Sequence, residues 1–61
     1  MQTHEKAKCY DAQGTLTQSG VTVVILDDRV MIGAATYPID DVTIDQDART
    51  ITSPNGWSVN Y

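Results

Sequence analysis

The side chains best suited to chemistry in this chain are aspartates, six of which fall between positions 27 and 47. They form three groups, which are Asp27 with Asp28, Asp40 with Asp41, and Asp45 with Asp47. A pair of carboxylates works as general acid and base only where a cleft desolvates one of them. A chain of 61 residues offers little depth for such a cleft. We therefore predict that the protein is not an enzyme, and turn chemistry explains each group at its position.

Metal binding and nucleophilic catalysis find equally little support among the residue types. A calcium site takes roughly six to eight oxygen ligands, commonly from a loop with a glycine at its sharp turn. The loop around Asp45 and Asp47 is short and has neither glycine nor glutamate. The only Cys–His pair, Cys9 with His4, lies in a polar amino-terminal stretch. A thiol nucleophile needs a positioned base, so we expect no catalytic residue, no cofactor and no metal.

The aspartates also suggest mimicry of a nucleic acid. Side chains two residues apart on a strand are separated by about 6.6 Å, which is comparable to the spacing of successive phosphates. A row of Asp41, Asp45 and Asp47 would then act as a decoy that blocks a nucleic-acid-binding enzyme. The simpler and stronger interpretation is that acidic residues keep a small protein soluble. The net charge of −4 itself disfavours direct binding to nucleic acid.

The elements that must position these side chains are short β-strands. The segments Val42 to Asp45 and Trp57 to Tyr61 alternate apolar with polar residues, a period of two that is typical of half-buried strands. Val21 to Leu26 is rich in β-branched residues. No segment has a helical repeat of ten or more residues. The sequence predicts an all-β fold, a small antiparallel meander of five or six short strands that forms an open barrel or a strongly bent sheet.

The chain length allows one domain. Positions 1–6 are polar and terminal, so we expect a flexible amino-terminal segment there. Positions 7–61 would form a single small all-β domain. The residues expected in or near its core are Val23, Ile25, Val30, Ile32, Val42, Ile44, Ile51, Trp57 and Val59.

The strand Val21 to Leu26 is apolar on both faces, since Val24 and Leu26 point away from its other apolar residues. One face of an antiparallel sheet normally meets water. The second face could be covered by the amino-terminal segment, by the far wall of a small barrel, or by a second copy of the chain. A single cysteine rules out an intramolecular disulfide, so association is the remaining stabilising device. We expect a homo-oligomer with Val24 and Leu26 at its interface.

The function expected from these features is protein binding. Tyr37 precedes Pro38 in a loop-like stretch, and tyrosine is favoured at interface centres. The partner-binding candidates are therefore Tyr37, Asp41, Asp45, Asp47, Val24 and Leu26. The chain would be a non-catalytic binding module, a small inhibitor or an accessory protein of a phage or bacterium. Because no apolar run approaches a membrane span, we expect no membrane contact and a cytoplasmic location.

Overall fold

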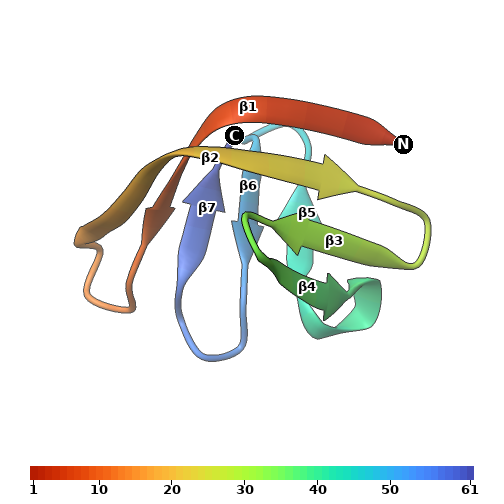
Figure 1. Ribbon diagram of the computed structural model, residues 1–61. Coiled ribbons are helices and arrows are strands. Elements are labelled where there is room, and N and C mark those ends of the chain that lie inside the picture. The colour runs from red at the N-terminus through yellow and green to blue at the C-terminus, as the bar shows by residue number, and fades with distance from the viewer.

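One curled sheet of seven antiparallel strands accounts for most of the chain in the computed structural model, which describes residues 1–61 (Figure 1). The strands are β1 (Gln2–Tyr10), β2 (Leu16–Ile25), β3 (Arg29–Ile32), β4 (Ala35–Pro38), β5 (Thr43–Asp45), β6 (Thr50–Thr52) and β7 (Ser58–Asn60). The predicted all-β class and strong bending are confirmed, with slightly more strands than expected. The sheet forms an open half-barrel. The only helix is the 3-10 turn η1 (Ile39–Asp41), and no helix has the length and apolar character needed to cross a membrane.

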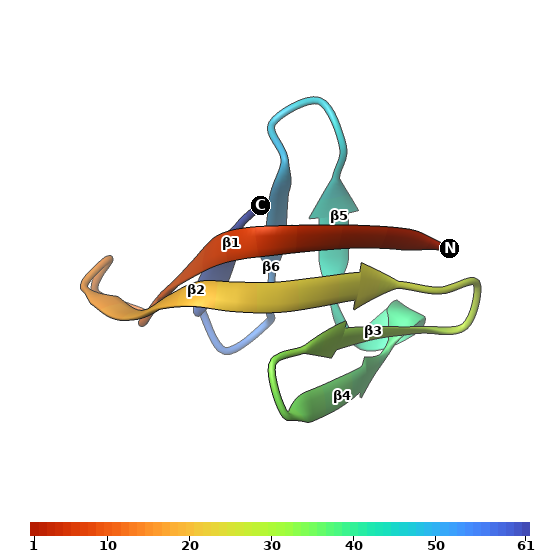
Figure 2. The same cartoon turned by 45° about the horizontal axis from the view of Figure 1, so that its top comes forward.

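The strand order is β4-β3-β2-β1-β7-β6-β5. The chain runs outward from β1 to the edge strand β4, passes through η1 to the other edge strand β5, and returns through β6 and β7. The last strand then pairs with the first, with Cys9 of β1 opposite Val59 of β7. Figure 2 shows the resulting arrangement, in which β1 and β2 lie across β5 and β6. Both edges of the sheet are therefore strands of only three or four residues.

The amino-terminal segment, expected to be flexible, has positions 2–6 in strand β1. Gln2, Thr3 and His4 stand opposite residues of β2. Polar side chains do not prevent this pairing, since the ladder is made by backbone groups. The His4 ring also packs against Tyr61, with centroids 4.4 Å apart. These contacts attach the segment to the sheet.

Bulges between β1 and β2 bend the sheet. Glu5 and Lys6 of β1 stand opposite the single residue Thr22, and Gly20 is an extra residue on β2. Lys6 and Gly20 both have positive φ, at 65° and 70°. A bulge adds local twist and turns the strand, so the two long strands curve over the rest of the sheet. This curvature closes one side of the half-barrel.

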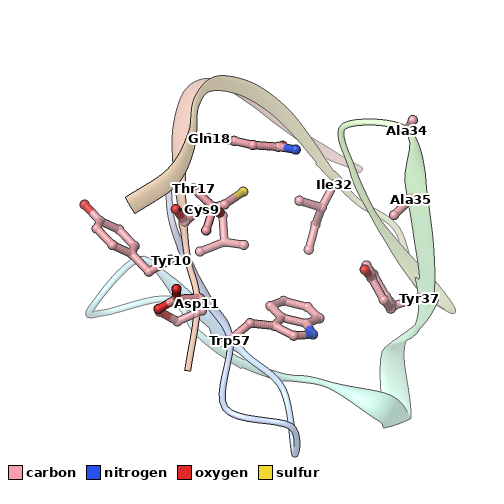
Figure 3. A pocket seen from close by; sticks show the side chains of 12 residues that line it. Cys9, Tyr10, Asp11, Thr17, Gln18, Ile32, Ala34, Ala35, Tyr37 and Trp57 are labelled. Atoms are coloured by element: carbon pink, nitrogen blue, oxygen red, sulfur yellow. Dashed lines mark hydrogen bonds between the residues drawn. The ribbon is translucent and has the colours of Figure 1, made fainter. Parts of the chain in front are cut away.

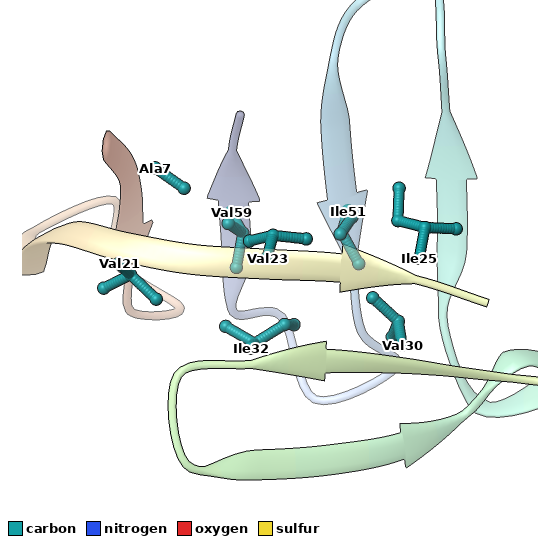
Figure 4. Close-up of a cluster of buried hydrophobic side chains, with 8 residues drawn as sticks. All are labelled: Ala7, Val21, Val23, Ile25, Val30, Ile32, Ile51 and Val59. Carbon is teal, nitrogen blue, oxygen red and sulfur yellow. The ribbon is translucent and has the colours of Figure 1, made fainter. Parts of the chain in front are cut away.

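The core lies on the concave face, where β2 and β3 meet β6 and β7 (Figure 4). Its eight buried residues are Ala7, Val21, Val23, Ile25, Val30, Ile32, Ile51 and Val59. Six of the nine residues expected in or near the core are among them. Val42, Ile44 and Trp57 are half-buried and pack against the cluster. Ala7 and Val21 are additional members, brought in by the curvature of β1 and β2.

The two-faced strand β2 is covered on one face by its own chain. Val21, Val23 and Ile25 point into the core, as barrel closure would require. Val24 and Leu26 lie half-buried on the outer face. The direct cross-strand neighbours of Val24 are Thr3 and Met31. The curling of the sheet thus buries the inner face of β2, whereas Val24 and Leu26 on the outer face are only partly covered.

Candidate functional site

A groove of about 500 Å³ lies at the mouth of the half-barrel, and Figure 3 shows the side chains that line it. Strands β1, β2, β3, β4 and β7 each contribute to its wall. The core residues Ile32 and Val59 form part of the lining, so the groove reaches down to the packed interior. The aromatic rings of Tyr37 and Trp57 also face the groove, whereas the Tyr10 ring points away from it (Figure 3).

Tyr37 and Trp57 form the centre of the groove. Their ring centroids lie 5.0 Å apart with the planes inclined at 47°, a favourable tilted arrangement for two aromatic rings. Tyr37 comes from β4, where it stands opposite Val30 of β3. Trp57 comes directly before β7. Both side chains are half-buried and pack against the core, so each ring has a supported side and a side that faces the groove.

The turn before β7 sets the position of Trp57. The Ser53 N–H donates to the Trp57 carbonyl (3.0 Å), and the Gly56 N–H donates to the Ser53 carbonyl (3.0 Å). The Asn55 N–H donates to Ser53 Oγ (3.2 Å). Gly56 has φ of +99°, which an L-residue adopts only with strain. Residues 53–56 thus form a tight turn in which glycine supplies the positive angle.

The turn between β1 and β2 has the same hydrogen-bond pattern. The Asp11 N–H donates to the Thr15 carbonyl (2.9 Å), and the Gly14 N–H donates to the Asp11 carbonyl (3.0 Å). The two turns touch, because a Cβ placed on Gly56 would lie 3.1 Å from the Ala12 Cβ. This contact joins the side of the groove that carries Asp11 to the side that carries Trp57.

Cys9 lines the groove as a half-buried free thiol. Burial removes water from the thiolate and raises the pKa of Cys9 above its ordinary value. The thiol is therefore protonated near neutral pH. His4 does not line the groove and instead lies against Tyr61. The structure does not bring the only cysteine and the only histidine together as nucleophile and base.

The groove offers hydrogen-bond donors that the protein does not use. No protein atom accepts a hydrogen bond from the hydroxyl group of Tyr37 or from Trp57 Nε1. Neither of these atoms is enclosed, since Tyr61 Oη is the one buried side-chain polar atom that lacks a partner. A bound molecule can therefore reach apolar ring faces and free donors in one place.

A second hollow of about 280 Å³ adjoins the groove at the aromatic pair, since Tyr37 and Trp57 line both. Asp40 and Asp41 of η1 line the second hollow, and Asp11 lines the first. No lysine or arginine lines either one. Arg29 instead pairs with Asp28 at 3.4 Å. An aromatic centre with carboxylates on both sides suits a ligand that is apolar and positively charged.

The structure brings two of the six predicted binding residues into this groove, namely Tyr37 and Asp41. Val24 lies near the end of β2 and Leu26 follows that strand directly, and neither residue lines the groove or the second hollow. Asp45 ends β5, and its Oδ1 accepts hydrogen bonds from the N–H groups of Asp47 (3.0 Å) and Ala48 (3.1 Å). Asp45 thus stabilises the β5–β6 turn through its side chain, as expected of a short acidic residue.

The proposed row of three aspartates does not follow a strand. Asp41 lies in η1, Asp45 ends β5, and Asp47 belongs to the next turn. The spacing argument of about 6.6 Å between alternate residues requires one continuous strand. The structure therefore lends the phosphate-mimicking geometry no support.

The sequence alone did not place Tyr10, Asp11, Asp40 and Trp57 in a binding site. Trp57 was expected in or near the core, and it is both packed on the core and exposed to the groove. The sequence does contain one signal for the two turns beside the groove. Asp11 to Gly14 and Ser53 to Gly56 each place a turn-forming side chain three residues before a glycine. That pattern indicates two similar turns, although not that they touch.

Comparisons with family models, with curated proteins and with solved structures found no match to this chain. No group of three or more histidine, cysteine, aspartate or glutamate residues is arranged to hold a metal ion. The geometry and charge of the groove are therefore the features that bear on function.

Proposed function

We propose that this protein is a non-catalytic protein-binding module that holds a segment of a partner protein in the groove between Tyr37 and Trp57. The observation that carries the proposal is the combination of an apolar aromatic centre with carboxylates on both sides and no basic side chain. The segment would present an apolar side chain next to a lysine or arginine. A small cytoplasmic inhibitor or accessory protein of a phage or bacterium would act in this way.

The apolar part of the contact supplies most of the affinity. Full burial of one leucine-sized side chain is worth about 1.5–3 kcal/mol, and the half-buried rings of Tyr37 and Trp57 provide a surface for it. Exposed ion pairs contribute only about 0–1 kcal/mol. Asp40 and Asp41 therefore act mainly on the rate of encounter and on the orientation of the segment.

Selection from a library of random peptides tests the proposal. We expect the selected peptides to combine an apolar residue with lysine or arginine, and to lose binding to Tyr37→Ala. Asp41→Asn and Asp47→Asn form a matched pair, because each removes one exposed carboxylate and only Asp41 lines the groove. Binding should weaken in the first variant and stay unchanged in the second. Peptides that bind Tyr37→Ala as well as the natural chain would contradict the proposal.

The alternative function, an acidic decoy for a nucleic-acid-binding enzyme, predicts a different response at Asp45 and Asp47. Its binding would weaken in Asp45→Asn and Asp47→Asn and would collapse as salt is raised, because its contacts are ionic. No feature of the described geometry favours it over docking in the groove. The same matched variants therefore separate the two functions.

Self-association would use a different surface, the outer face with Val24, Leu26 and Met31. A standard dimer buries about 800 Å² per partner, which is roughly a fifth of the 4040 Å² surface of this chain. These three side chains alone supply less than that, so a dimer must also bury its polar neighbours. Light scattering over a concentration series tests this. A molar mass above the 6.7 kDa of one chain that falls in Val24→Thr would support association through this face. A mass of 6.7 kDa at every concentration would exclude it.

A further inference from the structure

We infer that the segment held by the groove is a proline-rich stretch in the polyproline II conformation, with a lysine or arginine directed at Asp40 and Asp41. This inference rests on the proposed function and adds the conformation and the orientation of the partner. It follows from four features, which are the aromatic lining of the groove, its unused donors, its charge distribution and the shortness of the sheet edges.

The aromatic lining suits proline. Tyr37 and Trp57 line one groove, and their rings are inclined to one another rather than stacked face to face. Aromatic-lined grooves are the surface on which polyproline II segments dock. A proline ring is compact and apolar and packs on such faces, and a preformed helix loses little conformational entropy on binding.

The unused donors suit a backbone that has no internal hydrogen bonds. In a polyproline II helix the carbonyl groups project outward and are satisfied by solvent or by a partner. Tyr37 Oη and Trp57 Nε1 are free to donate to them. Proline has no N–H group, so such a segment needs few acceptors from the groove.

The sheet edges suit an added β-strand less well. A strand that joins a sheet needs a row of exposed N–H and C=O groups along an edge. β4 has four residues and ends in Pro38, which cannot donate, and β5 has three residues. Short edges and an edge proline are features that discourage strand addition. Side-chain recognition in the groove is therefore favoured over extension of the sheet.

The charge distribution orients the segment. Asp40 and Asp41 are exposed, and their carboxylates make no hydrogen bond within the protein. Asp11 Oδ1, at the other side of the groove, already accepts from the N–H groups of Gln13 and Thr15. The η1 side thus has two free carboxylates, and a basic side chain gains more there.

Three synthetic peptides of about nine residues test the inference, since a polyproline II segment of that length spans roughly 28 Å against a longest molecular dimension of 29 Å. The first is proline-rich with a terminal arginine, the second has alanine in place of each proline, and the third is an alternating valine–threonine strand former with the same arginine. Titration calorimetry with the full chain gives each affinity. We expect the first to bind about tenfold tighter than the second, because proline lowers the ordering cost.

Substitutions locate the contacts. Trp57→Phe keeps an aromatic ring and removes the Nε1 donor, and we expect it to weaken the proline-rich peptide severalfold, roughly the effect of one hydrogen bond. Replacing Asp40 and Asp41 together by asparagine should weaken the arginine peptide and leave the same peptide with glutamine unchanged. Circular dichroism of each variant, compared with the natural chain, verifies that the fold is retained.

The outcomes separate this inference from the proposal on which it rests. If the valine–threonine peptide binds as tightly as the proline-rich one, the inference is wrong and docking in the groove stands. If none of the basic peptides binds, both fail. If light scattering shows that Tyr37 is needed for self-association and peptides do not compete, a second copy of the chain occupies the groove, and the inference is overturned.

Discussion

The ring centroids of Tyr37 and Trp57 lie 5.0 Å apart, although β4 is an edge of the sheet and Trp57 precedes a strand four places away in the sheet order. A flat sheet would hold these positions far apart, because neighbouring strands are about 4.8 Å from one another. The contact therefore exists only because the sheet curls. The groove and the curvature of the half-barrel are one structural feature.

Replacement of Tyr37 by alanine should lower the free energy of unfolding by about 1–2 kcal/mol, because the variant loses an aromatic pair and half-buried apolar area. Urea unfolding monitored by the fluorescence of Trp57, the single tryptophan, measures the change. Tyr37→Phe keeps the ring and should stay within about 0.5 kcal/mol of the natural chain. Equal stability of Tyr37→Ala would show that the ring pair does not support the fold.

Gly56→Ala should be more destabilising than Gly14→Ala. Both glycines have positive φ, +99° and +82°, so each substitution carries a backbone cost of about 1 kcal/mol or more. Only the methyl group on Gly56 meets a neighbour, the Ala12 Cβ at 3.1 Å, whereas Gly14 faces open space. Thermal unfolding of the two variants gives the difference.

A second substitution identifies the cause of that difference. Ala12→Gly removes the methyl group that Gly56→Ala would meet, so the double variant should recover part of the lost stability. If the two substitutions are additive, the contact between the turns does not account for the extra cost.

Local sequence patterns predicted the strands well, because alternation of apolar and polar residues depends only on the pleat. Most of the strand expected over Val21 to Leu26 is present as the second half of β2, which ends at Ile25. The strand expected at Val42 to Asp45 is present as β5 over Thr43–Asp45. The polar segment before Ala7 gave no strand signal, because its pairing depends on backbone groups alone.

The groove could be predicted only in part. Tyr37 was recognised as a contact from its place before Pro38, and Trp57 as a residue in or near the core. Their meeting depends on the bulges at Lys6 and Gly20. Positive φ at a lysine has no signal in composition or periodicity, since most non-glycine residues avoid that region. Strong bending was expected, but the positions of these bulges, and with them the contacts between the two halves of the sheet, have no signal in a local pattern.

Asp45→Ala should lower the free energy of unfolding by about 0.5–2 kcal/mol, the usual effect of losing a side-chain cap. Its Oδ1 accepts two backbone N–H groups that would otherwise be unpaired in the β5–β6 turn. Asp47→Ala is the matched control, because its side chain makes no hydrogen bond. Chemical unfolding should show a loss for the first variant only. A similar loss in both would point to a general charge effect.

The Cys9 thiol should react slowly with iodoacetamide at mildly alkaline pH, compared with the same chain unfolded in urea. Burial raises the pKa of Cys9, and the thiolate is the reactive form. Between the unfolded and folded pKa values the folded state holds more protons, so stability falls as pH rises through this range. Cys9→Ala should lack this alkaline slope. Reaction as fast in the folded as in the unfolded chain would show that the thiol is not desolvated.

The most direct test of docking in the groove is a nitrogen–proton correlation spectrum recorded while a basic, proline-rich peptide is added. Trp57 gives the only indole N–H signal, since the chain has one tryptophan. The account predicts saturable shifts of this signal and of the amides of Asp11 and Tyr37, with the β5–β6 turn at positions 46–48 unchanged. Shifts confined to that acidic turn, or an indole signal that does not move at saturating peptide, would contradict it.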